Sequence, residues 1–211
     1  RYEVSNNAGQ DICDIVNNEG FDFLLVGSGI SMSDSPDDIA ATRYRTSFYN
    51  RYFKRFKAPE SWFYPGALLK DKTKMFIARS NCDVGVFINR NFVKATNTLV
   101  VISSEEDLFL LDYTRTLLKA THGSVGIVAK MSTTTPGHDQ ILKELWDFVS
   151  SIPQTQLLPD KDLTPGLFNS YNFMLIGYNT WNDVSEHRKE ALQKMPSTLI
   201  LNKNKRSSSD N

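Results

Sequence analysis

The chain has only two cysteines and three histidines, and no apolar run reaches the roughly 18 residues that a transmembrane helix needs. Cys13 lies in an apolar helical stripe and Cys82 opens an apolar segment, so both are predicted to be buried thiols. None of the histidines, His122, His138 and His187, has a second ligand at metal-binding spacing. HExxH, CxxC and GxSxG motifs are also missing. We therefore expect no catalytic residues and no metal.

The chain also has no excess of positive or negative charge. The 24 basic and 24 acidic side chains cancel, which argues against bulk attraction to nucleic acid but leaves room for a local patch. Hydrophobic residues make up 40% of the 211 residues, enough for a core without disulfides or metals. Because the sequence starts at Arg1 and shows no signal-peptide pattern, we expect it to be a piece of a longer protein.

Two apolar segments echo each other. Residues 21–27 read FDFLLVG and residues 171–177 read YNFMLIG. Runs that are apolar on both faces are typical of strands inside a parallel sheet covered by helices. The closing glycine permits a sharp turn or the close approach of a ligand.

Strands and helices alternate along the rest of the chain. Further strands are predicted at residues 84–88, 97–102, 124–129, 156–158 and 197–201. Helices are predicted at residues 7–18, 105–120, 138–151 and 182–195. This alternation predicts an α/β fold, a doubly wound parallel sheet flanked by helices. We interpret residues 1–95 as the end of a first, incomplete repeat and residues 96–203 as a second, nearly complete one. Residues 204–211 are predicted to be disordered.

A basic aromatic segment, RYRTSFYNRYFKRFK, occupies residues 43–57. Its aromatic residues recur at helical spacing, and its basic residues are Arg43, Arg45, Arg51, Lys54, Arg55 and Lys57. We favour a surface helix whose aromatic face packs on the sheet. Contact of the basic residues with a membrane surface or a partner is the second interpretation. Stacking on single-stranded nucleic acid is the weakest, because no supporting motif occurs elsewhere.

An acidic cluster, Ser103-Ser104-Glu105-Glu106-Asp107, follows the strand at residues 97–102. In an open parallel sheet, ligands bind beyond the carboxyl ends of the strands, so the cluster is expected at such a crevice. Alternatively, its carboxylates only populate the first turn of a helix, where the positive end of the helix dipole favours them. The second interpretation is the stronger one.

A short glycine turn, Gly27-Ser28-Gly29, follows the first echo segment, as a phosphate-binding turn does. It is not the GxGxxG pattern, and the nearby Asp34 and Asp37 would repel phosphate. The turn is therefore weak support for a bound nucleotide.

These segments together resemble a known family. Residues 76–86, FIARSNCDVGV, are similar to the end of a universal stress protein unit. The CDVGVFI stretch from Cys82 looks like the cytosolic tails of plant and fungal monovalent cation/proton antiporters, which carry two such units in tandem. TLVVISSEED, from Thr98, and GSVGIV, from Gly123, fit the start of the second unit. The resemblance spans residues 7–202, and fungal potassium/proton antiporters of internal membranes match best.

The resemblance implies a universal stress protein-like, Rossmann-like fold and a regulatory domain that modulates potassium/proton exchange through ligand sensing or protein contacts. It also implies a place on the cytosolic side of a Golgi or endosomal membrane. The partners would be the transmembrane antiporter body of the same polypeptide and a second copy in a homodimer. The alternative is a free-standing nucleotide-binding stress protein or weak ATPase.

Neither repeat keeps the glycine pattern with which stress proteins bind ATP. After Gly29 no third glycine follows at the required distance, and Gly177 precedes the bulky run Tyr178-Asn179-Thr180-Trp181. No cofactor is therefore assigned with certainty, although an adenine nucleotide stays open. Its candidate ligand-binding residues are Gly27, Ser28, Gly29, Ser103, Ser104 and Gly177.

Overall fold

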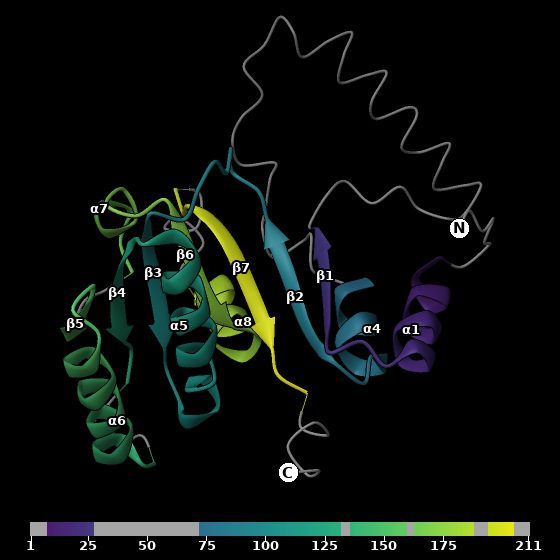
Figure 1. Ribbon diagram of the computed structural model, residues 1–211, viewed down its shortest axis with the longest axis horizontal. Coiled ribbons are helices and arrows are strands. Elements are labelled where there is room, and N and C mark those ends of the chain that lie inside the picture. The colour runs from purple at the N-terminus through teal and green to yellow at the C-terminus, as the bar shows by residue number, and fades with distance from the viewer. Residues whose placement is uncertain (1–7, 28–71, 132–135, 160–162, 188–193, 205–211) are drawn as a thin grey trace, which may run out of the picture.

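A computed structural model describes the chain over residues 8–27, 72–131, 136–159, 163–187 and 194–204 (Figure 1). The strands are β1 (Phe23–Gly27), β2 (Asp83–Ile88), β3 (Asn97–Ile102), β4 (Ser124–Ala129), β5 (Thr155–Pro159), β6 (Phe173–Gly177) and β7 (Ser197–Asn202). The helices are α1 (Ala8–Glu19), α4 (Lys72–Arg79), the 3-10 turn η2 (Glu105–Asp107), α5 (Leu110–Thr121), α6 (His138–Ser151), α7 (Pro165–Phe168) and α8 (Tyr178–His187).

All these strands form one seven-stranded sheet with the order β1-β2-β7-β6-β3-β4-β5. Five of its neighbouring pairs are parallel, and β2 with β7 is antiparallel. From β3 onward the strands form a doubly wound unit, in which the strand order reverses between β3 and β6. The predicted α/β class with a doubly wound sheet is confirmed, and the sheet as a whole is mixed.

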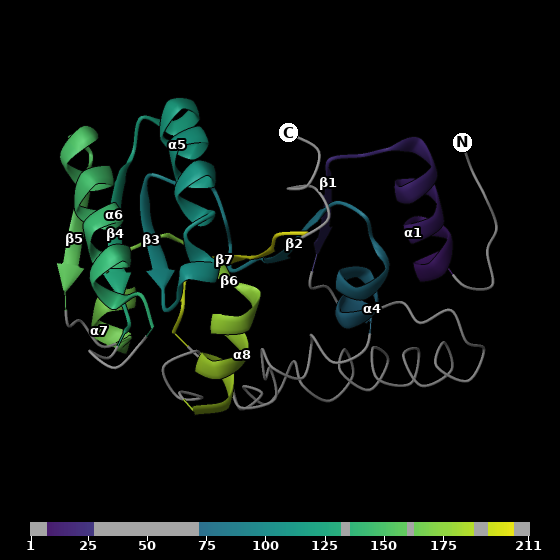
Figure 2. The same cartoon turned by 90° about the horizontal axis from the view of Figure 1, so that it is seen from below.

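Helices cover both faces of the sheet in this second unit (Figure 2). Helices α5 and α6 lie on one face, and α7 and α8 lie on the other. Alternate residues of β3 pack on opposite sides: Val100 joins the cluster with α5 and α6, whereas Leu99 joins the cluster with Trp181 of α8. This alternation follows from the two-residue period of a strand, and it explains why β3 and β6 are apolar on both faces.

The first unit contributes less to the sheet within the described residues. Helices α1 and α4 pack on one side of β1 and β2, where Cys13, Phe76 and Val84 form a small buried cluster. Both cysteines are buried, as predicted. The expectation that residues 21–27 form an interior strand is wrong for the described chain, because β1 lies at the sheet edge and its residues are exposed or half-buried.

A local two-fold symmetry relates the two units. In the first, Phe23 of β1 pairs with Asp83 of β2, and in the second, Phe173 of β6 pairs with Ser197 of β7. Matching β1 to β6 and β2 to β7 through these pairs makes Val86 the counterpart of Ile200. These two residues pair directly with each other across the antiparallel β2–β7 seam. The echo in the sequence is therefore a structural repeat whose two-fold axis passes through the Val86–Ile200 pair.

Two predicted helices begin elsewhere than expected. Residues 105–120 do not form one helix: the short turn η2 comes first, and α5 begins at Leu110. The second helix begins at Tyr178, directly after β6, rather than at residue 182, because Thr180, Trp181 and Val184 form its buried face. Because Thr180 is polar, this buried face does not stand out in the sequence as an apolar stripe. The short helix α7 was not predicted.

The boundary predicted between residues 95 and 96 falls in the loop between β2 and β3, and the division into domains stays a prediction. The basic aromatic segment at 43–57 lies outside the described residues, as do Ser28, Gly29 and the predicted disordered tail beyond residue 204.

Candidate functional site

The candidate site is the crevice at the carboxyl ends of β3 and β6, where the strand order of the second unit reverses. Open α/β sheets bind their ligands at this position, because the adjacent connections leave on opposite faces and the strand ends stay uncovered between them. Ser103 and Ser104 follow β3, and Gly177 ends β6. The structure thus brings three of the predicted ligand-binding residues together.

The carboxylate of Asp107 fills this crevice from within. Its Oδ2 accepts hydrogen bonds from the backbone N–H of Ser103 at 2.8 Å and of Ser104 at 3.2 Å. The hydroxyls of Ser103, at 3.1 Å, and Thr180, at 2.7 Å, donate to the same oxygen. These two hydroxyl groups also contact each other. Asp107 is only 2% exposed, so four donors surround a carboxylate removed from water.

The second carboxylate oxygen of Asp107 lies against Gly177. A Cβ atom built on Gly177 would overlap Oδ1 and would lie 3.2 Å from Cγ of Asp107. Glycine is required here because a carboxylate of the same chain occupies the space, and its φ is not in the left-handed region. The closing glycine of β6 thus serves close packing rather than the approach of a ligand.

The rim of the crevice is also occupied by polar groups of the chain. The side-chain amide of Asn179 donates to Oε2 of Glu106 at 2.8 Å, which joins the start of α8 to η2. A hollow of about 220 Å³ remains beside Asp107 and Gly177. Ligand pockets of proteins measure roughly 300–1,000 Å³, so this hollow is smaller than a nucleotide needs.

Both expectations for the acidic cluster have a counterpart in the structure. All three acidic residues are on the short turn η2. The side chain of Asp107, unlike those of Glu105 and Glu106, turns back and accepts hydrogen bonds at the end of β3. Sequence reasoning gave this crevice as the weaker of two interpretations of the cluster, and it did not select Asp107 or Thr180 as site residues. A Ser-x-x-Asp pattern from Ser104 to Asp107 was the available signal, because an acid three residues after a serine folds back onto the serine's N–H.

The predicted ligand-binding residues do not form one site. Because β2 and β7 run antiparallel, the carboxyl end of β1 lies at the opposite end of the sheet from that of β6 (Figure 1). Gly27 is therefore remote from Gly177, Ser103 and Ser104. A Cβ built on Gly27 meets no atom of the described residues within 4 Å, so no packing among them requires this glycine. Its partners in the predicted turn, Ser28 and Gly29, lie outside the described residues.

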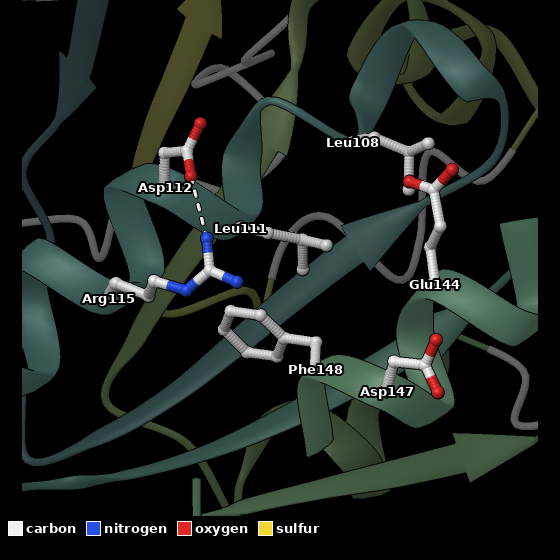
Figure 3. Close-up of a pocket in the computed structure, with 7 residues that line it drawn as sticks. All are labelled: Leu108, Leu111, Asp112, Arg115, Glu144, Asp147 and Phe148. Carbon is white, nitrogen blue, oxygen red and sulfur yellow. Dashed lines mark hydrogen bonds and ion pairs between the residues drawn. The ribbon is translucent and has the colours of Figure 1, made fainter. Parts of the chain in front are cut away.

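A larger hollow of about 390 Å³ lies between α5 and α6 (Figure 3). Arg115 pairs there with Asp112 at 2.9 Å, and its guanidinium lies 4.9 Å from the centre of the Phe148 ring. Glu144 and Asp147 line the hollow from α6 (Figure 3). Arg115 is the one cation among the described residues that line this hollow, and it already has a carboxylate partner. Two further carboxylates oppose an anionic ligand, so we assign no phosphate site here.

The histidines have structural positions. His122 caps α5 in the left-handed conformation, with φ of 52°. His138 opens α6 beside Asp139, and His187 ends the described part of α8 beside Asp183. Among the residues that the structure describes, no three His, Cys, Asp or Glu side chains are placed to bind a metal ion.

Polar contacts of Asp83 join the two units near the hollow of about 220 Å³, which Asn204 also lines. The Tyr113 hydroxyl of α5 donates to Oδ2 of Asp83 on β2 at 2.8 Å, and the N–H of Asn204 donates to Oδ1 at 2.8 Å. Burial, and then the bonded carboxylate, raise the pKa of Tyr113 far above its usual value. Burial and the neighbouring charge of Asp83 also raise the pKa of the Cys82 thiol, which makes it a poor nucleophile.

Comparison with known proteins supports the fold. No family model matches the chain, and no curated protein matches it in sequence. Among solved structures, the chain is similar to a universal stress protein from Archaeoglobus fulgidus DSM 4304, with a TM-score of 0.51 and 12% sequence identity. The match covers 93% of this chain and 66% of that protein. At this identity the likeness shows the fold alone, and the fold is that of the universal stress proteins.

Within the described ranges, no helix is both long enough and apolar enough to cross a bilayer.

Proposed function

We propose that the chain is a non-enzymatic regulatory domain that works through protein contacts on a universal stress protein scaffold. The observation that carries this proposal is the filled crevice: Asp107 occupies the position where this fold would hold a ligand. A phosphate placed there would lie against the buried carboxylate of Asp107. The groups that could donate hydrogen bonds to the phosphate already donate to that carboxylate. The donors of Ser103, Ser104 and Thr180 serve the chain's own carboxylate instead.

The regulated protein that we propose is the body of a monovalent cation/proton antiporter, in which this chain is the cytosolic tail. This part of the proposal rests on the resemblance of residues 76–88 and 98–107 to antiporter tails. Its consequence is that the tail biases the transporter between states through differential contacts. In membrane vesicles containing the complete transporter, removal of the tail should change the rate of potassium/proton exchange. An unchanged rate would contradict this role.

A nucleotide-binding stress protein is the second candidate, because the fold is that of a universal stress protein. Its only remaining phosphate cradle would be the turn at Gly27, since the crevice of the second unit is filled. The homodimer and the membrane contact of the basic segment also stay predictions. The two units of this chain pair with each other through β2 and β7, so neither of these strands has an edge left for a second copy. A homodimer would therefore use another surface.

Isothermal titration calorimetry of the purified chain with ATP, ADP, AMP and NAD, with and without magnesium, separates the two candidates. We expect no saturable heat with any of them. Micromolar binding would overturn the proposal, and two variants would then locate the site. Loss of binding in Gly29→Val would place it at the first unit, whereas loss in Gly177→Val with Gly29→Val unaffected would place it at the crevice.

A further inference from the structure

The symmetry-related strands β1 and β6 differ in how far their side chains are exposed to solvent. Phe23 and Leu25 of β1 are 36% and 58% exposed, whereas their counterparts Phe173 and Leu175 of β6 are 5% and 2% exposed. The sequences of the two strands are alike, so the difference comes from what covers them. Phe21, two residues before β1, is also exposed, at 49%. We call Phe23 and Leu25 the open face of β1.

The covering elements of the second unit are visible in the structure. Strand β3 pairs in parallel with β6 on the edge away from β7. Helix α5, which follows β3, packs on the same side of the sheet as Phe173 and Leu175 and buries Leu110 and Leu111 with them. In the described residues β1 pairs with β2 alone, and no strand occupies its other edge.

The symmetry also determines which side is open. In an antiparallel pair, opposed residues point to the same side of the sheet, so the axis through Val86 and Ile200 keeps each face on its own side. The open face therefore lies on the side of α5, and Phe23 contacts Tyr113 of that helix, with ring centres 6.0 Å apart. The other side chains of β1, Leu24 and Val26, pack against the cluster of α1 and α4.

We infer that the open face of β1, together with the edge that no described strand occupies, binds a strand–helix segment of a partner protein. An apolar strand would pair in parallel with β1, as β3 pairs with β6. The amphipathic helix that follows would cover Phe23 and Leu25, as α5 covers Phe173 and Leu175. An unpaired strand edge beside exposed aromatic and aliphatic side chains is the surface on which strand addition occurs. This inference concerns β1 alone and does not rest on the proposed regulatory role.

The test supplies such a segment at high effective concentration. A second copy of residues 97–159, which carries β3 to β5, is fused ahead of Arg1 in the full chain. Hydrogen–deuterium exchange is then measured for residues 23–27. We expect exchange there to slow by about tenfold or more relative to the unfused chain, because the added strand takes up the edge amides.

Two variants of the fusion provide the contrast. Leu25→Lys places a charge on the open face and should abolish the protection. Trp146→Lys in the original chain changes a side chain of similar exposure, 52%, on α6 and should leave the protection intact. Leu25 is exposed, so the unfused Leu25→Lys chain should keep its melting temperature. If the fusion does not fold, a synthetic peptide of residues 96–122 added to the full chain replaces it, with the same readout.

Three results would overturn the inference. Unchanged exchange at residues 23–27 in the fusion or with the peptide would show that the edge does not accept a strand. Slow exchange already in the unfused chain would show that another part of the chain covers the edge. The third is a concentration-dependent dimer in sedimentation that Leu25→Lys dissociates, which would assign the face to a second copy.

Discussion

At the scale of single residues, the second unit depends on one buried carboxylate and one glycine. Asp107 accepts four hydrogen bonds through Oδ2, and Gly177 leaves room for Oδ1. An apolar crevice would leave the N–H groups of Ser103 and Ser104 without a partner, which is costly in a buried position. The acidic side chain therefore stabilises the strand ends in the way that a bound anion does elsewhere.

The two closing glycines offer a matched test of this packing. Gly177→Ala should lower the free energy of unfolding by about 1–3 kcal/mol, because the new methyl group overlaps the Asp107 carboxylate. Gly27→Ala, at the symmetry-related position, should change it by less than about 0.5 kcal/mol, since its methyl group meets no atom of the described residues within 4 Å. Urea unfolding followed by circular dichroism measures both. Equal effects of the two substitutions would contradict the packing argument.

At the scale of elements, α5 connects the two units. Its apolar residues pack on the second unit, and its Tyr113 reaches Asp83 of β2. Because the folded state raises the pKa of Tyr113, that state holds the phenol proton more tightly than the unfolded chain does, where the pKa is about 10. Stability is thus full below about pH 10 and falls as the pH rises above that value.

Tyr113→Phe should therefore reduce the loss of stability above about pH 10. It should also lower the free energy of unfolding at pH 7 by about 0.5–1.5 kcal/mol, through the lost hydrogen bond to Asp83. Urea unfolding at pH 7 to 11 compares the variant with the parent chain. Tyr171→Phe is the comparison: burial also raises the pKa of Tyr171, but the hydrogen bond with Gln156 lowers it, so this variant should reduce the loss of stability above about pH 10 by less than Tyr113→Phe does. Parallel curves for Tyr113→Phe and the parent would contradict the assignment.

At the scale of the whole molecule, the β2–β7 seam makes one sheet from two repeats. Val86 and Ile200 meet at its centre, and both are almost fully buried, at 2% and 1% exposed. An isolated pair of strands is marginally stable, so β1 and β2 depend on the five strands beyond the seam. The two units should consequently unfold together.

Ile200→Ala tests this coupling. It should lower the free energy of unfolding by about 2–4 kcal/mol, because it leaves a cavity at the centre of the seam. Hydrogen–deuterium exchange should become faster both in β1, at one edge of the sheet, and in β4, next to the strand at the other edge. Ile12→Ala, at a half-exposed position of α1, should have a much smaller effect. Faster exchange in β1 alone would show that the units unfold separately.

The sequence by itself determined the elements and their class. Apolar runs such as VVI in β3 and MLI in β6 mark strands buried on both faces, and the amphipathic stripes of α5 and α6 mark the covering helices. The repeat between residues 21–27 and 171–177 was also readable, because the two strands fill equivalent positions. These features are local, since they depend on periods of two and 3.6 residues along the chain.

Only the tertiary structure decided how the repeats meet and what fills the site. Periodicity does not specify which strand pairs with which, so the antiparallel seam and the open edge of β1 were not predictable from the strands themselves. The direction of Asp107 was equally hidden, because a carboxylate after a strand suits both a solvated helix start and a buried crevice. The choice depends on Thr180 and Gly177, which lie at least 70 residues away in sequence and become neighbours only when β6 pairs with β3.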